Sequence, residues 1–144
     1  MATVPSNKLK FELTNARVDF ASDTFKMILM QSGFTFDVDT DHGYSDVSAS
    51  EIANGNGYTT GGVTLSGVAV TEDDSDNRTE VTWNNATWTA SGGSIGPAAG
   101  AIIYDDTASS PQADTVIGYI DFGGDITQAD GGTLTIANPE VRVS

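Results

Sequence analysis

Apolar side chains recur along this chain in short runs with the two-residue period of β-strands. The clearest runs are 101–104 (AIIY), 115–122 (TVIGYIDF) and 133–136 (TLTI), and turn-rich acidic connectors separate them. The middle run is apolar on most of both faces, which is typical of a central strand covered by a second layer. The run 133–136 alternates threonine with aliphatic residues, which predicts a half-exposed strand. We expect this block to form the middle of an antiparallel sheet.

Further strands are predicted on both sides of this block. The run 24–30 (TFKMILM) predicts a strand buried on both faces, and 140–143 (EVRV) predicts an edge strand. In 63–70 (VTLSGVAV) the apolar phase changes midway, so we expect one strand with a β-bulge at Ser66-Gly67.

The region 80–90 places two tryptophans on one face of the predicted sheet. Trp83 and Trp88 share this face whether Asn84-Asn85 is a two-residue turn or a bulge in one longer strand, and the pattern does not separate the two. We expect both tryptophans to be core anchors rather than a platform for stacking a ligand. The following stretch 91–100 is rich in glycine and predicts a mobile loop that exposes Ile95.

Helical signals are few. Residues 48–51 (SASE) match a capping box, which predicts one helical turn over 49–53. Residues 7–16 fit either a strand or a short helix, and we favour the helix. Residues 1–6 predict a flexible or partner-ordered arm, and the four glycines of 55–62 predict tight turns or close backbone contacts.

Together these patterns predict an all-β protein with about eight short strands and one or two short helices. The favoured architecture is an antiparallel β-sandwich, jelly-roll-like, formed by a single domain at 18–144 after an N-terminal arm or short helix at 1–17. The 144 residues include 16 glycines, which suits short strands joined by tight turns. The absence of cysteine excludes disulfides and thiolate chemistry.

The charge of the chain is strongly negative and unevenly distributed. Twenty acidic residues oppose six basic ones, and four of the basic residues lie within the first 26 positions. The acidic body would repel nucleic acid and anionic lipid, so we expect no binding to nucleic acid or membrane. No basic-then-apolar leader and no run long enough to span a bilayer is present, so we expect synthesis in a cytoplasm.

Candidate chemistry is sparse. Asp37, Asp39 and Asp41 alternate as at the start of a calcium loop, but His42 and Ser48 stand where that loop requires glycine and glutamate. An ordinary solvated acidic loop is therefore the preferred interpretation, and the same holds for the acidic stretch 71–78. No catalytic motif surrounds the single histidine, so we expect neither an enzyme nor a bound cofactor.

Several segments, in order, resemble one family. They are DxxKxxL (Asp23, Lys26, Leu29), YSDVSASEI followed by GxGYTxGG within 44–62, IIYDDT at 102–107 and IGYIDFGG at 117–124. Between about Val18 and Ile136 the chain is similar to small virion structural proteins of tailed bacteriophages. Some members of such families resemble capsid decoration or cement proteins, which are small β-sandwich modules on the outside of the head.

The resemblance implies a place on the capsid surface of the virion, with the major capsid protein as partner and a dimer or trimer on the shell. The basic N-terminal residues are then the expected capsid-contact side chains, namely Lys8, Lys10, Phe11, Arg17 and Lys26. Two alternatives remain at this stage. One is a head–tail connector or tail component, and the other is a virion-surface carbohydrate-binding module that uses Trp83 or Trp88.

Overall fold

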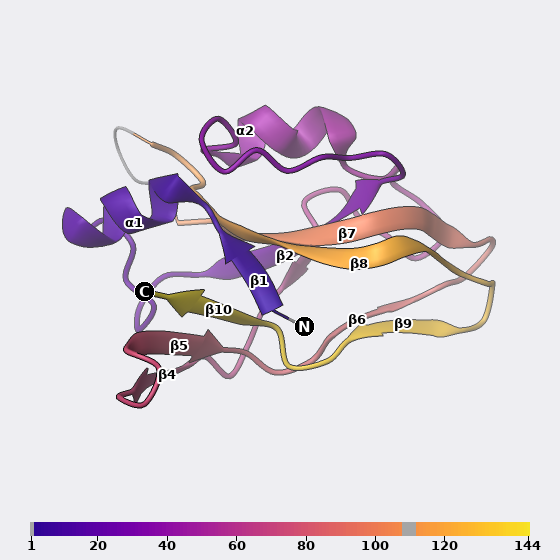
Figure 1. Ribbon diagram of the computed structural model, residues 1–144. Coiled ribbons are helices and arrows are strands. Elements are labelled where there is room, and N and C mark those ends of the chain that lie inside the picture. The colour runs from indigo at the N-terminus through magenta and orange to yellow at the C-terminus, as the bar shows by residue number, and fades with distance from the viewer. Residues whose placement is uncertain (1, 108–111) are drawn as a thin grey trace.

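The computed structural model describes residues 2–107 and 112–144. Met1 of the predicted arm and residues 108–111 of the predicted acidic connector lie outside this range. The chain folds into two β-layers with two short helices (Figure 1), and the predicted all-β, sandwich-like fold is confirmed. The elements are β1 (Ala2–Pro5), α1 (Asn7–Thr14), β2 (Phe25–Gln31), α2 (Tyr44–Val47) with a 3-10 turn (Ser48–Ser50), β3 (Val63–Thr64), β4 (Ala69–Asp73), β5 (Arg78–Thr82), β6 (Ala86–Thr89), β7 (Ile95–Asp105), β8 (Val116–Gln128), β9 (Thr133–Ile136) and β10 (Glu140–Val143).

Eight of the strands form one continuous sheet in the order β3-β2-β7-β8-β1-β10-β5-β4. The sheet changes layer at β1, where Ala2 and Thr3 pair with β10 while Val4 and Pro5 pair with β8. The prediction of a flexible arm at 1–6 is therefore wrong. A strand of four residues that ends in proline is too short to show alternation, and its neighbours come from distant parts of the chain.

The main core lies between the two layers. Both tryptophans are buried here, as predicted, and β6 and β9 extend the lower layer beneath β7 and β8 (Figure 1). Ile95 is also buried, because 95–100 continues strand β7 instead of forming a mobile loop. The glycines and the proline of 95–100 are uncommon within strands, so the sequence did not predict this one, which pairs with the far end of β8.

A second apolar cluster lies on the outer face of β2, β7 and β8, which confirms the prediction that the central strands are buried on both sides. The segment 34–47 covers it. Phe34 and Phe36 pack against Tyr119 with ring centroids 5.4 and 5.6 Å away, and Tyr44 stacks on Tyr104 at 4.8 Å.

The helical turn predicted over 49–53 lies earlier in the chain. Helix α2 begins after Gly43, where the Asp46 carboxylate accepts the N–H of Gly43 at 3.0 Å and of His42 at 3.1 Å. Glu51, assigned to the capping box, is instead extended and buried. Burial of Glu51 among hydroxyl donors outweighs the local capping signal. Residues 7–14 do form the favoured short helix, capped by the Ser6 hydroxyl, which accepts the N–H of Leu9.

Three predictions about the lower layer are wrong. The run 63–70 is not a bulged strand, because β3 and β4 lie at opposite edges of the sheet and the chain crosses between them at Gly67, with φ +66°. The runs at 80–83 and 86–90 form neither a hairpin nor one strand, since β6 leaves the large sheet to pair with β9. Strand β10 is internal, between β1 and β5, rather than at an edge.

Candidate docking surface at the α1 end

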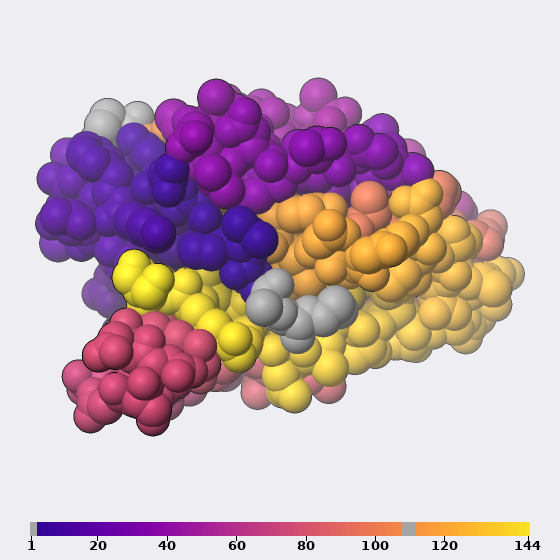
Figure 2. Space-filling model, viewed as in Figure 1, coloured from indigo at the N-terminus to yellow at the C-terminus, as the bar shows by residue number. Residues whose placement is uncertain are grey.

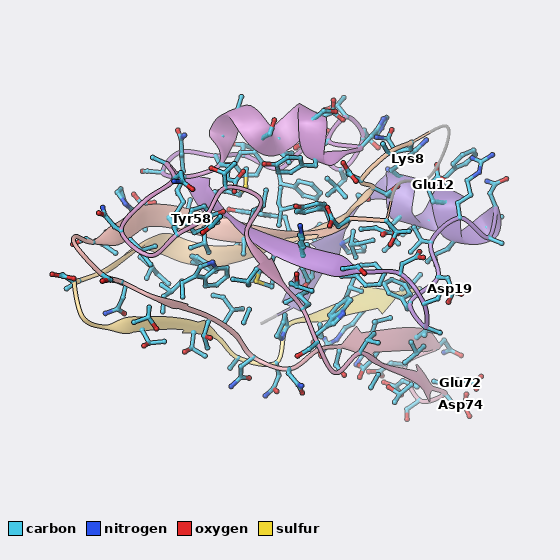
Figure 3. All side chains as sticks on the ribbon, turned by 180° about the vertical axis from the view of Figure 1, so that it is seen from behind. Lys8, Glu12, Asp19, Tyr58, Glu72 and Asp74 are labelled. Carbon is cyan, nitrogen blue, oxygen red and sulfur yellow. The ribbon has the colours of Figure 1, made fainter. Side chains whose placement is uncertain are left out.

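Two of the five predicted capsid-contact side chains neutralise a buried carboxylate. Glu12 is fully buried on helix α1, and its two oxygens lie 3.1 Å from Lys8 Nζ and 3.4 Å from Arg17 Nη1. A buried carboxylate needs such partners, because removing one leaves an uncompensated charge. Lys8 and Arg17 therefore have a structural role in holding α1 and the chain after it (Figure 3).

The other three predicted residues differ in their freedom to meet a partner. Lys26, on β2, lies 2.9 Å from Asp106 Oδ2. Lys10 is exposed on α1 and makes no ion pair within the described part of the chain. Phe11 is 52% exposed, with Lys8 Nζ 4.8 Å from the centre of its ring. Lys10 and Phe11 are therefore the members of the predicted set that remain available at the surface.

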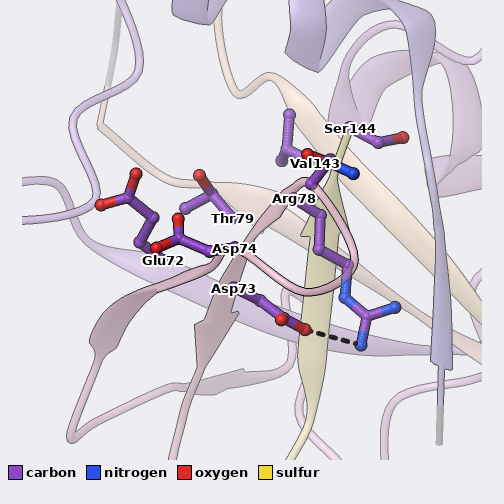
Figure 4. A pocket seen from close by; sticks show the side chains of 8 residues that line it. Glu72, Asp73, Asp74, Arg78, Thr79, Val143 and Ser144 are labelled. Carbon is purple, nitrogen blue, oxygen red and sulfur yellow. Dashed lines mark ion pairs between the residues drawn. The ribbon is translucent and has the colours of Figure 1, made fainter.

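An acidic hairpin, β4–β5, projects from the same end of the molecule (Figure 2). The stretch 71–78, predicted as a loop, is strand on both sides of a turn at 74–77. Arg78 holds the hairpin by ion pairs of 3.3 Å to Asp73, 3.0 Å to Asp76 and 2.7 Å to Glu80. Figure 4 shows Glu72 and Asp74 directed away from this guanidinium, so their charges face solvent.

An apolar groove of about 530 Å³ separates this hairpin from the segment after α1. We call it the α1–β4 groove. Its floor is rigid, because Phe20 stacks on Phe25 with ring centroids 5.1 Å apart and meets Trp83 edge-on at 6.0 Å. On one wall Val70 of β4 is 53% exposed. The full lining is Leu13, Ala16, Val18, Asp19, Phe20, Ala21 and Val70.

Asp19 is the charged residue in the lining of this groove. The Ala21 N–H and the Ser22 hydroxyl donate to its carboxylate, and these bonds lower the pKa of Asp19 below its usual range. Glu72 follows Val70 by two residues on β4 and points to the same face of the strand. Figure 3 shows Asp19, Glu72 and Asp74 together at this end of the sandwich. The groove is thus apolar inside and acidic at its rim.

The predicted calcium candidates stabilise their own loop. Asp37 accepts the N–H of Asp39, and Asp41 accepts the N–H of Asp37, both at 2.9 Å. Asp39 accepts the side-chain amide of Asn7. Within residues 2–107 and 112–144, no three acidic or histidine side chains are grouped as metal ligands. His42 Nε2 lies 2.6 Å from the Asp39 carbonyl oxygen, which ties this histidine to the same loop.

Glu51 is a buried carboxylate that accepts three hydrogen bonds in the interior. It accepts hydrogen bonds from the hydroxyls of Tyr44 and Tyr58, both at 2.6 Å, and from the Gly61 N–H at 2.8 Å. Burial and these bonds raise the pKa of Tyr44 to about 12, and burial raises the pKa of Tyr58 further. The hydroxyl of Tyr58 also accepts the Leu29 N–H, so the network ties 44–61 to β2. This arrangement is structural, since each polar atom of the network is used in packing.

A third buried carboxyl, Asp105 at the end of β7, lies near the Asp23 carboxyl. Burial raises the pKa of Asp105 to about 7, and Asp23 adds to the rise, while the Thr107 N–H acts against it. A buried carboxyl beside a second carboxyl holds its proton tightly, because its ionisation would place two negative charges close together. The pair is therefore sensitive to pH near neutrality.

Both tryptophans are only 3% exposed, which removes them as a stacking platform for a carbohydrate. The groove residues Val18, Phe20 and Val70 were not predicted from the sequence, because they come together only in the folded chain and 63–70 was predicted to be one continuous strand. The one available signal was the phase change at 63–70, which marks the point where the chain leaves one edge of the sheet for the other. No helix in the described ranges has the length and apolarity to cross a bilayer.

Comparison with known proteins finds no family model that matches the chain, no similar curated protein and no similar solved structure.

Proposed function

We propose that this chain is a non-enzymatic structural protein of a bacteriophage virion, most closely a decoration or cement protein on the outside of the head. The ordered segments that resemble virion structural proteins support the phage assignment. The observation that supports an attachment role is the α1 end of an otherwise acidic sandwich. An apolar groove, the exposed Phe11 and an edge of β4 that no other described strand pairs with lie there. Exposed apolar patches with polar rims are typical of protein contacts.

The rest of the molecule suits crowding on a shell. The net charge of −14 keeps a protein soluble at high local concentration, because neighbouring copies repel each other except where a specific contact holds them. Apolar layers on both faces of β2, β7 and β8 give a rigid body. In this proposal the α1 end faces the major capsid protein, and the opposite end, with Asp125 and Asp130, faces solvent.

The structure alters how the contact would be made. Lys8, Arg17 and Lys26 are engaged in ion pairs within the chain, so we assign the contact to Lys10, Phe11 and the α1–β4 groove. The strand β1, bound on both sides, is unsuited to lie along a capsid groove as a free arm. A dimer or trimer on the shell remains part of the proposal.

The deciding experiment is the copy number of the chain in purified particles of the phage that encodes it, measured by quantitative mass spectrometry against the major capsid protein. Tens to hundreds of copies that scale with the shell support a decoration role. About six or twelve copies indicate a connector or tail ring and overturn it. Absence from the particle overturns the virion assignment as a whole.

A further inference from the structure

We propose that the outer edge of β4 and the α1–β4 groove together form a site that captures an extended segment of a partner protein as an added β-strand. On the face that meets the groove, the segment carries an apolar side chain and, two residues further along, a lysine or arginine. The identification of the partner as a shell subunit rests on the proposed function, whereas the site itself rests on the geometry below.

The backbone of β4 is available for pairing. β4 ends the eight-stranded sheet, with β5 on its inner side and no strand of the described residues on its outer side. It spans five residues, four of them exposed. Natural proteins usually shorten or cover such an edge, because its free N–H and C=O groups accept another chain. Peptide segments that add to open edges in this way form a known class of recognition.

The groove supplies a pocket next to this edge. Val70 belongs both to the strand and to the groove wall, so a segment paired with β4 places every second side chain on the face that carries the groove. The ring of Phe20, held in place by stacking on the buried Phe25, gives those side chains a fixed apolar floor. A backbone ladder with a side-chain pocket beside it provides both affinity and selectivity.

The negative charges at the rim of the groove favour a partner segment that carries basic side chains. Asp19 lies in the groove, Glu72 lies two residues beyond Val70, and Asp74 follows in the turn. Glu72 and Asp74 make no ion pair within the described part of the chain, so they are available for a cation from outside. An aliphatic side chain at one position and a lysine or arginine two residues further along, on the same face of the added strand, match this pattern.

A second copy of the chain fits this edge poorly. Antiparallel pairing of two β4 strands would bring Glu72 and Asp73 of one copy beside an edge with the same negative charges in the other. Each chain carries a net charge of −14, so long-range repulsion adds to the mismatch. A partner with basic residues meets the opposite condition.

The test uses the full chain and a labelled synthetic peptide, followed by fluorescence anisotropy at physiological salt. In this peptide valines and lysines alternate at every second position, with threonines between them, so that both kinds of side chain lie on the face that meets the groove. A control peptide has the same residues with the valines on one face and the lysines on the other. Val70→Asp is compared with Val68→Asp, since both valines are exposed and Val68 lies outside the groove lining. Both substitutions add one carboxylate, which favours a basic peptide, so a loss of affinity in Val70→Asp alone reports the apolar contact.

We expect the alternating peptide to bind at least tenfold more tightly than the control peptide, and Val70→Asp to weaken binding at least tenfold. Val68→Asp should change the affinity less than twofold. Circular dichroism should show that both variants stay folded, because the replaced side chains are exposed. Glu72→Lys gives a second variant, expected to weaken binding through the rim charge alone.

Equal affinity for the two peptides, or equal effects of the two aspartates, would reduce the binding to nonspecific charge attraction and overturn the site. A dimer of the unliganded chain that Val70→Asp dissociates would overturn it as well, because the occupant would be a second copy. The two proposals fail separately. Peptide binding without incorporation into particles overturns only the virion function, while normal incorporation of Val70→Asp overturns only the role of the edge.

Discussion

The eight-stranded sheet ends in two edges that differ in length, cover and charge. β3 is only two residues long, and the chain leading into it packs its backbone directly on β2. β4 has five residues, exposed valines beside it and solvent-facing carboxylates. We call the short edge at β3, which the preceding chain packs against, the closed edge. We call the longer, exposed edge at β4 the open edge. The difference indicates that the open edge is retained for a contact, because the chain has the means to close an edge where closure serves stability.

A few residues stabilise the closed edge through close backbone contacts and buried hydrogen bonds. Gly62 approaches β2 so closely that a Cβ on it would lie 1.9 Å from the Met27 carbonyl oxygen. Glu51 fixes the adjoining turn through the Gly61 N–H, and Tyr104 donates its hydroxyl to the Gly61 carbonyl at 2.8 Å. Stability in this half of the molecule therefore comes from backbone proximity and buried hydrogen bonds.

The most severe way to break the closed edge is Gly62→Ala. The residue has φ +76°, and the added methyl group would collide with the backbone of β2. We expect a loss of about 3 to 4 kcal/mol in the free energy of unfolding, measured by urea denaturation. Gly33→Ala is the matched control, because Gly33 has φ +80° and open space around it. Its loss should be about 1 kcal/mol, and equal losses in the two variants would contradict the close approach at Gly62.

Glu51→Gln tests the hydrogen-bond network at the same edge. Glutamine keeps the shape of the side chain but replaces an accepting oxygen with a donor that faces tyrosine hydroxyls. We expect a loss of about 2 to 3 kcal/mol in the free energy of unfolding. Glu72→Gln, on the open edge, should change stability by less than about 0.5 kcal/mol. Comparable losses in the two variants would contradict the conclusion that buried hydrogen bonds stabilise the closed edge while the side chains of the open edge add little stability.

Asp105→Asn tests the closed half through pH. The folded pKa of Asp105, about 7, lies above its ordinary value of 3.8. The folded state therefore holds this proton more tightly, and its contribution to stability is complete at low pH and is lost as pH rises from about 4 through 7. Asparagine is uncharged beside Asp23 at every pH, so the variant should be more stable than the parent by about 2 kcal/mol at pH 8 and nearly equal at pH 4. The measurement is thermal unfolding across this range.

Asp106→Asn serves as the control for that titration, since Asp106 is partly exposed and pairs with Lys26. It should leave the pH dependence between 4 and 8 almost unchanged. A parent protein whose stability does not fall over this range would show that the Asp105–Asp23 pair is not protonated near neutrality.

The smallest effect is expected on the open edge. Arg78→Ala removes three ion pairs at the surface of the hairpin, yet exposed pairs of this kind contribute little each. We expect a loss of about 1 kcal/mol at low salt that shrinks when salt is added. A loss as large as that of Glu51→Gln, independent of salt, would show that the hairpin is part of the stable core.

The sequence predicted those elements whose signal lies within one strand. Alternation at 133–136 and the doubly apolar runs 24–30 and 115–122 identified β9, β2 and β8, and the shared face of Trp83 and Trp88 identified core. The failures share a cause, which is that partner and layer are set by residues far away in the chain. The residues around Ala2–Pro5 do not predict that this strand pairs with β8 and β10. The residues around 63–70 do not predict that β3 and β4 lie at opposite edges of the sheet.

For the candidate site, too, the sequence predicted what depends on neighbouring residues and failed to predict what depends on tertiary packing. The composition at the N-terminus directed attention to the α1 end, where the proposed contact with Lys10 and Phe11 lies. It did not reveal that Lys8 and Arg17 are held by Glu12, because the burial of one carboxylate on α1 depends on tertiary packing. The groove could not be predicted from the sequence for the same reason, because Val70 and Phe20 come together only in the folded protein.

The position of β1 has a consequence for the order of events during synthesis. β1 is translated before the other described strands, whereas its two neighbours, β8 and β10, are translated much later. The Thr3 hydroxyl donates to the Glu140 carbonyl across 137 residues of sequence. The two layers can therefore be joined through β1 only after β10 has been translated, and we expect nascent chains that lack β10 to keep the upper layer unclosed. We therefore expect the contact that joins the two layers to form late in folding, although one of its strands, β1, is translated before the other described strands.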